Sequence, residues 1–240
     1  MNRTLFVHHH LGMGDHIICN GLIRSLLGTN SSFQSIAVFA KEGNHKRVQR
    51  MFDDDSRIMV ISVPSDANEV LYVNSVVEQY KICDFIRCGF GIGENLESMG
   101  VVSNFDEGFY ACAGIPFDHR WTRFRLRRNR ESEQEALKRL NPTGQPFVFV
   151  HDDPSRGFIL NPETPKELAV IKNDPSIDMF DMISLLENAS EIHCMESSFR
   201  CLIEHIDTIV CPLYLHTSVR PERRMGNFVL SSSKKNWIRS

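Results

Sequence analysis

Short apolar runs alternate with longer amphipathic segments along most of this chain. The short runs have the length and the β-branched or aromatic content of buried strands, whereas the longer segments carry apolar residues at helical spacing. In the first half this pattern predicts strands at Thr4–His9, Ser35–Phe39, Arg57–Val63 and Ile82–Arg87, and helices at Ile17–Leu27, His45–Phe52 and Asn68–Gln79. Strands that alternate with helices favour parallel β-α-β units with right-handed crossovers. The first half is therefore expected to form a Rossmann-like domain.

The same alternation resumes on a smaller scale after Pro142. It predicts strands at Phe147–Val150, Leu168–Lys172, Glu191–Met195 and Thr208–Leu215, and helices at Met179–Asn188 and Ser197–His205. Just before it, basic and apolar residues alternate over 119–128, and a charged helical pattern follows at Glu131–Leu140. We place a domain junction there, with an N-terminal domain at 1–130 and a C-terminal domain at 131–240. The expected fold class is α/β, with two Rossmann-like domains facing across a cleft that takes the ligand at the strands' carboxyl ends.

Composition excludes several classes of protein. The 240 residues are 42% hydrophobic and 24% charged, as in an ordinary soluble globular chain, and no apolar run approaches the ~18 residues of a membrane span. The first 15 residues lack the basic and apolar regions of a secretory signal, and the seven cysteines form no C-x-x-C pair. We therefore expect a cytoplasmic protein with reduced thiols. A net charge of −3 is too weak to attract nucleic acid over the whole surface, so nucleic acid is not an expected partner.

The segment LGMGDHI, residues 11–17, is the strongest local signal for a ligand site. It lies between the first expected strand and the first expected helix. Gly12 and Gly14 permit a tight turn and a close approach of backbone to ligand, and the start of a helix offers free N–H groups to an anion. Ile17 stands where a dinucleotide-binding fingerprint has its third glycine, and no P-loop lysine follows. Binding of NAD or a nucleoside triphosphate therefore loses its main support.

Asp15 is the chemically unusual residue of this segment. A carboxylate at the start of a helix can cap the helix, or it can accept a proton from a substrate hydroxyl. The residues alone leave both roles open. Met13 and His16 lie in the same turn and join Gly12 and Gly14 in the predicted binding set.

Two polar segments follow expected strands in the second half. After Phe147–Val150 come His151 and Asp152, and then Arg156, whose guanidinium suits a phosphate through two parallel hydrogen bonds. An exposed turn with a solvated arginine is the competing interpretation. His151 can likewise orient a sugar or ribose, or belong to a turn that hydrogen-bonds its own backbone.

The other polar segment follows Glu191–Met195. Glu196, Ser197, Ser198 and Phe199 lead from the strand into an amphipathic helix, which places hydroxyl and N–H groups where a phosphate or diphosphate would bind. Capping of the helix by one of the serines is the alternative.

Histidines and arginines elsewhere offer weaker candidates. His8, His9 and His10 are successive residues of an expected strand, so their side chains point alternately to opposite faces and cannot share one metal ion; no metal site is expected. The arginine-rich run from Arg120 to Arg130 can bind RNA. It can also be a solvated strand between the domains whose arginines pair with the glutamates of the following helix.

Together these segments resemble the GT-B glycosyltransferases, closest to the heptosyltransferase-like group and more distantly to the GT-B fucosyltransferases. The resemblance lies in the order strand, GxGD and helix near the N-terminus, followed by a helix-strand-acid-hydroxyl-helix unit within 178–215. Glu196 and Ser197 stand where that group usually has Asp followed by Ser or Thr, and Ser198 stands where it usually has Gly. The chain is short for this fold, so we expect a compact variant of it.

The resemblance implies an enzyme that transfers a hexosyl or related sugar from a nucleoside-diphosphate sugar to an acceptor hydroxyl. It implies inversion at the anomeric carbon, since a single carboxylate base facing the acceptor suits that outcome. It implies no cofactor and no metal, an N-terminal domain that binds the acceptor and a C-terminal domain that binds the donor. Asp15 would be the general base, while Gly12 and Gly14 would shape the loop around the diphosphate or the acceptor. The sequence does not identify the acceptor.

On the donor side, the resemblance implies that Ser197 and Ser198 hold phosphate oxygens and that Arg156 offsets the charge of the leaving diphosphate. The alternative function is a non-catalytic nucleotide- or RNA-binding protein on a Rossmann-like fold, with the Arg120–Arg130 face as its working surface.

Overall fold

The chain forms two compact units, Met1–Arg127 and Arg128–Ser240. The structure is a computed structural model that describes residues 3–28, 32–81, 84–89, 104–219 and 232–240. Most of the glycine-rich segment 89–94, the first residues of the strand expected at Ile82–Arg87, and Cys83 lie outside these ranges.

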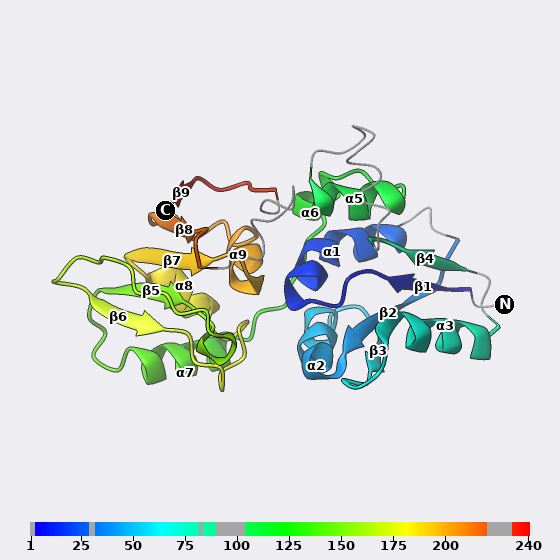
Figure 1. The fold of residues 1–240 in the computed structure, drawn as a ribbon, viewed down its shortest axis with the longest axis horizontal. Coiled ribbons are helices and arrows are strands. Elements are labelled where there is room, and N and C mark those ends of the chain that lie inside the picture. The colour runs from blue at the N-terminus through cyan, green and yellow to red at the C-terminus, as the bar shows by residue number, and fades with distance from the viewer. Residues whose placement is uncertain (1–2, 29–31, 82–83, 90–103, 220–231) are drawn as a thin grey trace. The chain divides into compact units, whose positions relative to one another are not determined.

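The N-terminal unit is built on a four-stranded parallel sheet in the order β3-β2-β1-β4. Strands and helices alternate along it, and α5 and α6 lie against α1 (Figure 1). Its strands are β1 (Thr4–His8), β2 (Ser35–Lys41), β3 (Ile58–Val63) and β4 (Phe85–Arg87), and its described helices are α1 (Met13–Leu26), α2 (Glu42–Met51), α3 (Glu69–Gln79), α5 (Phe105–Cys112) and α6 (His119–Thr122).

The central strand β1 pairs with both β2 and β4, which places Val7 opposite Val38 and Ile86. Alternate residues of a strand face opposite sides of a sheet, so one face of this sheet presents apolar side chains to α1 and the other presents them to α3. Val73 and Val76 of α3 pack in one cluster with Phe6 and other buried residues of the sheet. This burial fixes the carboxyl ends of β1 and β2, from which the loops of the site begin.

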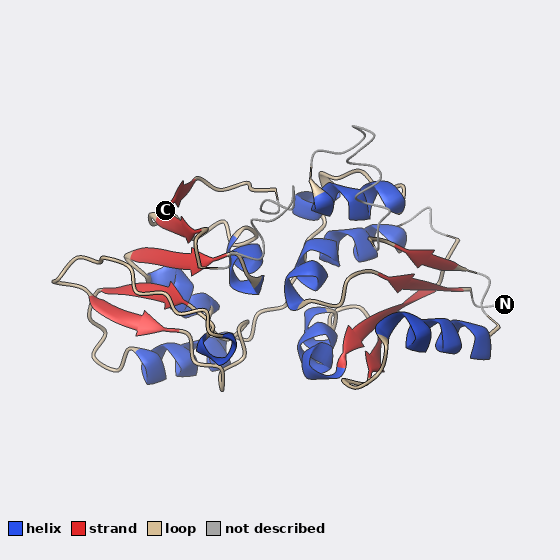
Figure 2. Ribbon diagram, in the orientation of Figure 1, coloured by secondary structure: helices blue, strands red, loops and turns tan. Residues whose placement is uncertain are grey.

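The C-terminal unit contains a five-stranded parallel sheet in the order β6-β5-β7-β8-β9 (Figure 2). Its strands β5 and β7 are buried at nearly every position, as expected for the centre of a parallel sheet. Its elements are α7 (Arg130–Leu140), β5 (Phe147–His151), the 3-10 turn η1 (Pro154–Arg156), β6 (Ala169–Lys172), α8 (Ile183–Asn188), β7 (Glu191–Met195), α9 (Ser198–Ile203), β8 (Leu213–His216) and β9 (Trp237–Arg239).

Parallel strands alternating with helices in both units confirm the expected α/β class. Several element boundaries differ from those expected, among them the starts of α1, α2, α8 and β8. Helix α1 begins at Met13 rather than Ile17, because Gly12 acts as the N-cap and Gly14 lies inside the first turn. Strand β8 begins at Leu213 rather than Thr208, because Pro212 has no N–H to donate to a sheet ladder and Val210 is exposed.

The strand considered for the arginine run from Arg120 to Arg130 is not formed. His119–Thr122 forms the short helix α6, and the buried guanidinium of Arg120 is bound by the buried carboxylate of Asp106 on α5. The predicted pairing with the following helix is present at Arg128, whose guanidinium donates hydrogen bonds to Glu133 of α7 and to Glu187. Ion pairs therefore hold both ends of this run.

Strand β9 was not expected from the sequence. Its segment is attached to the unit by Glu204, a fully buried carboxylate just after α9. Glu204 accepts hydrogen bonds from the backbone N–H groups of Lys234 and Lys235 and from Nε1 of Trp237 at 2.7–3.1 Å. No helix within the described ranges is both long enough and apolar enough to span a membrane.

Candidate functional site

Asp15 lies in the first turn of α1, at the carboxyl edge of the N-terminal sheet. Gly12 is the N-cap, its carbonyl accepts a hydrogen bond from the N–H of His16, and Asp15 is the third residue of the helix. The carboxylate folds back over the cap, because a Cβ placed on Gly12 would lie 2.6 Å from Asp15 Oδ2. The absence of a side chain at Gly12 therefore creates the space that the Asp15 carboxylate occupies.

The helical turn that carries Asp15 is anchored by the residue before its N-cap. Leu11 is buried in the cluster beneath the loop, and its carbonyl accepts a hydrogen bond of 3.1 Å from the side-chain amide of Asn44 on α2. Gly12 is exposed, and Met13, Gly14 and Asp15 are half-buried. The carboxylate is therefore held on a fixed backbone while its surroundings remain open to solvent.

His16, the next residue, is placed differently from Asp15. It is 1% exposed, its ring packs against His9 with centroids 4.7 Å apart, and neither ring nitrogen has a hydrogen-bond partner among the described residues. Burial holds the pKa of His16 well below its ordinary value, and burial lowers the pKa of His9 to about 4. Both rings are therefore neutral near pH 7 and form part of the interior behind the loop.

A charged network that sequence reasoning missed lies at the same edge of the sheet. His8 ends β1, and its Nδ1 accepts a hydrogen bond of 3.1 Å from Nε of Arg87, which ends β4. Its Nε2 therefore carries the proton and donates to Oε1 of Glu69 at 3.1 Å, and Lys41, which ends β2, lies 3.6 Å from the other oxygen of Glu69. Burial raises the pKa of Glu69, but the hydrogen bond from His8 and nearby positive charge outweigh it, so the pKa is lowered. Charged residues at the ends of three strands were the available signal.

In the C-terminal unit the structure brings His151 and Phe199 together. His151 ends β5, Phe199 lies in the first turn of α9, and their ring centroids are 4.4 Å apart. The two residues are remote in sequence, but β5 and β7 are neighbouring strands, so the loops that follow them share one edge of the sheet. Both rings are largely buried.

Ser197 is the N-cap of α9, and its Oγ accepts a hydrogen bond of 3.4 Å from the N–H of Arg200. The capping role anticipated as an alternative is therefore present. Ser198 is the first helical residue, and both serines are half-buried. Glu196 is 7% exposed, with Oε2 3.7 Å from Nε of the buried Arg200.

The polar residues of the turn after β5 have different environments: Asp152 is buried, whereas Arg156 is exposed. Asp152 is 2% exposed; its Oδ2 accepts hydrogen bonds from the N–H of Leu160 and from Nζ of Lys172, the latter at 2.7 Å. Asp152 therefore fixes the turn. Arg156 lies on η1 with 56% of its side chain exposed, 3.7 Å from Asp153 and over the ring of Phe158. Its guanidinium remains accessible at the carboxyl edge of the sheet.

No group of three or more His, Cys, Asp or Glu side chains that could hold a metal ion occurs in the described part of the chain. The arginine run 120–130 does not form one continuous face either. Arg120 is fully buried, and Arg128 is bound to two glutamates, one of which, Glu187, has its pKa lowered to about 2, chiefly by the hydrogen bond from Arg128.

Each unit contains one parallel, Rossmann-like sheet with polar loops after the carboxyl ends of its strands. The chain therefore belongs to the class of proteins built from two such units. Within that class, the chain is similar in structure to a glycosyl transferase family 9 protein from Veillonella parvula DSM 2008, with a TM-score of 0.55 and 8% sequence identity. The match covers 90% of this chain and 81% of that one. It is also similar to E. coli ADP-heptose lps heptosyltransferase II, with a TM-score of 0.53, 10% identity, and coverage of 89% and 84% of the two chains.

No protein-family model matches the sequence, and no curated protein matches it. The structural likeness confirms the expected heptosyltransferase-like GT-B fold. It extends over nearly the whole chain, so both units take part in it.

Proposed function

We propose that the chain is a glycosyltransferase that moves a sugar from a nucleoside-diphosphate sugar to an acceptor hydroxyl, with inversion and without a metal ion. One observation carries the proposal: a carboxylate, Asp15, occupies the fixed first turn after β1 in a chain whose fold matches two glycosyltransferases over 89–90% of its length. A fold hosts many unrelated functions, so the function is argued from the side chains of the site.

In this proposal the N-terminal unit binds the acceptor, and Asp15 is the general base. Its carboxylate takes the proton of the acceptor hydroxyl while the hydroxyl oxygen forms a bond to the anomeric carbon. The bond from that carbon to the diphosphate breaks, and its electron pair leaves with the nucleoside diphosphate. Gly12, Met13 and Gly14, the N-cap and first residues of α1, line the acceptor side, and the buried His16 packs beneath this turn.

The C-terminal unit binds the donor in this proposal. Ser197 and Ser198 hold phosphate oxygens at the start of α9, and Arg156 supplies the positive charge that offsets the leaving diphosphate. His151 and Phe199 form the wall between these two segments, and Glu196 anchors the loop through Arg200. The exposure of Arg156 supports this role, since an accessible guanidinium can reorient toward a phosphate at little cost.

The test is the isosteric substitution Asp15→Asn. Loss of the general base should lower transfer by about 10²–10⁴-fold, while the melting temperature and the affinity for nucleotide stay close to those of the wild type. A thermal-shift panel with GDP, UDP, ADP and CMP first identifies the donor base, because a ligand that binds only the folded state raises the melting temperature. Release of that nucleoside diphosphate from its sugar then measures transfer.

Asp66→Asn provides the matched control, since Asp66 is an exposed acid in the same unit. It should leave transfer unchanged. Equal transfer by the wild type and Asp15→Asn would show that Asp15 is not the general base. A thermal shift with single-stranded RNA and with none of the nucleotides would favour the binding-protein alternative.

A further inference from the structure

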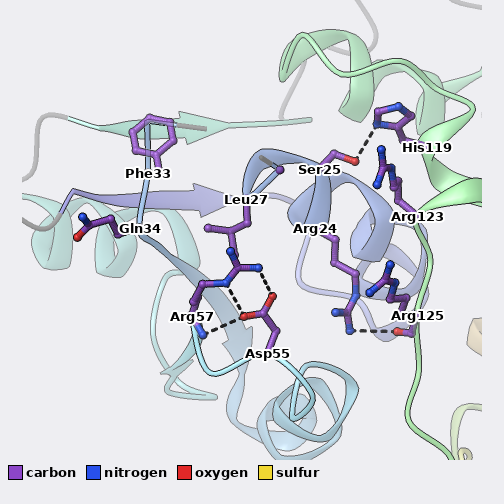
Figure 3. Close-up of a pocket in the computed structure, with 11 residues that line it drawn as sticks. Arg24, Ser25, Leu27, Phe33, Gln34, Asp55, Arg57, His119, Arg123 and Arg125 are labelled. Carbon is purple, nitrogen blue, oxygen red and sulfur yellow. Dashed lines mark hydrogen bonds and ion pairs between the residues drawn. The ribbon is translucent and has the colours of Figure 1, made fainter. Parts of the chain in front are cut away.

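The N-terminal unit contains a pocket of about 580 Å³ at the amino edge of its sheet. It lies between the C-terminal end of α1, the residues that precede β2 and β3, and the residues that follow α6 (Figure 3). Asp15 is at the other end of α1, and a helix of 14 residues is about 20 Å long. The pocket is therefore separate from the site proposed for glycosyl transfer. We call it the arginine pocket, after Arg24, Arg57, Arg123 and Arg125, which line it.

Two of these arginines build the frame of the pocket. Arg24 donates hydrogen bonds to both carboxylate oxygens of Asp54 at 2.7 and 3.1 Å, and to the carbonyl of Arg125. Arg57 forms two parallel hydrogen bonds with Asp55, at 2.6 and 2.8 Å. Their charges are therefore largely matched by carboxylates.

Arg123 and Arg125 are different. Their side chains are exposed and have no hydrogen bond or ion pair with any residue that the structure describes. Their backbone, however, is fixed. The side chain of Asn20, which is fully buried, accepts a hydrogen bond from the N–H of Arg125 at 3.0 Å and donates one to its carbonyl at 3.1 Å. The unit thus uses a buried polar side chain to hold the backbone of an arginine whose charge is unmatched.

His119 adds a further polar group to the pocket. The hydroxyl of Ser25 donates to the carbonyl of Gly21 at 2.6 Å, so it accepts the proton of His119 Nδ1 at 2.8 Å. This fixes the ring and leaves Nε2 as its remaining polar atom. Leu27 and Phe33 also line the pocket and contribute apolar surface.

We propose that the arginine pocket binds a phosphorylated small molecule that carries at least two phosphate charges, with Arg123 and Arg125 as its principal anion ligands. The charged side chains of the lining are four arginines and one aspartate, in a chain whose net charge is −3. Guanidinium groups match phosphate oxygens through two parallel hydrogen bonds. The volume falls within the range of about 300–1,000 Å³ that is typical of small-molecule sites, and the apolar lining accommodates an organic part of the ligand. A concave site of this size favours a small molecule over a nucleic-acid strand.

The test is calorimetric titration of the full chain with inorganic pyrophosphate, the smallest probe of this chemistry. We expect the double substitution Arg123→Gln/Arg125→Gln to weaken binding at least about tenfold, because hydrogen bonds to charged groups are among the stronger ones. The charge-matched control is Lys46→Gln/Arg127→Gln, which removes two cations of the same unit that do not line the pocket. It should bind as the wild type does. Circular dichroism and urea unfolding confirm that each variant is folded.

A third variant, Arg156→Gln/Ser197→Ala, separates this site from the proposed donor site and should keep pyrophosphate binding at the arginine pocket. Loss of pyrophosphate binding in Arg156→Gln/Ser197→Ala, with binding kept in Arg123→Gln/Arg125→Gln, would overturn the arginine pocket and leave the proposed transferase function standing. Equal binding by the wild type and Arg123→Gln/Arg125→Gln would also overturn it. The proposal would also be overturned if the chain bound no pyrophosphate but bound a 20-nucleotide single-stranded RNA and lost that binding when Arg123 and Arg125 were replaced.

Discussion

Gly12 and Asp15 form an interdependent pair at the start of α1. Any side chain at Gly12 meets the Asp15 carboxylate, because a Cβ there would lie 2.6 Å from Oδ2. The backbone of Gly12 is extended, with φ of −69°, so alanine is compatible with the conformation itself. We expect Gly12→Ala to move the carboxylate and to lower transfer by about 10²-fold, since displacement by about 1 Å has an effect of that size. Kinetics together with a melting curve measure this; transfer at the wild-type rate would show that the position of the carboxylate is not critical.

Asp15 and His16 are neighbours in one helical turn but differ in burial. Successive residues of a helix are about 100° apart around its axis, so Asp15 stays half-buried at the edge of the sheet while His16 turns into the interior beside His9. The sequence identified the turn and the carboxylate. It did not show which of the polar residues faces inward, because that depends on the elements packed against α1.

At the scale of elements, Gly21 sets the distance between α1 and α6. A Cβ on Gly21 would overlap the carbonyl oxygen of His119, and both groups belong to backbone that cannot move independently. We expect Gly21→Ala to lower the free energy of unfolding by about 1–3 kcal/mol, as overpacking does. Urea denaturation measures the change.

The matched control is Gly43→Ala in α2, where a Cβ would meet nothing within 4 Å. Alanine is the better helix former, so this variant should be more stable by up to about 0.5–1 kcal/mol. The two substitutions are chemically identical and differ only in what surrounds them. Equal effects would mean that α1 and α6 are not in close contact.

For the molecule as a whole, buried histidines predict a loss of stability in mild acid. Burial lowers the pKa of His9 to about 4, and it lowers the pKa of His16 as well. An unfolded histidine has a pKa near 6.5, so below that pH the unfolded chain binds protons that the folded chain does not. Stability is therefore complete above about pH 6.5 and is lost as the pH falls toward 4, by an amount on the order of 3 kcal/mol for His9. Carboxylates with a lowered pKa, such as Glu187, lose their contribution only at lower pH.

The two tryptophans allow this to be measured on one unit. Trp121 lies in the N-terminal unit and Trp237 in the C-terminal unit, and the chain has no others. In Trp237→Phe, the fluorescence of Trp121 during urea unfolding should report a midpoint that decreases between pH 7 and pH 5. His16→Leu in that background should make the decrease smaller. An unchanged dependence on pH would remove His16 from the explanation.

The periodicity of the sequence determined the α/β class and most strands, because buried parallel strands and amphipathic helices require distinct apolar patterns. It also located the GxGD turn, since the two glycines and the carboxylate are adjacent in the chain. Only the tertiary structure decided the rest. The burial of Arg120 against Asp106, the attachment of β9 by Glu204, the His8 network and the arginine pocket all join residues from separate elements. The energy of a buried or unmatched charge depends on what packing places beside it, and no local pattern contains that information.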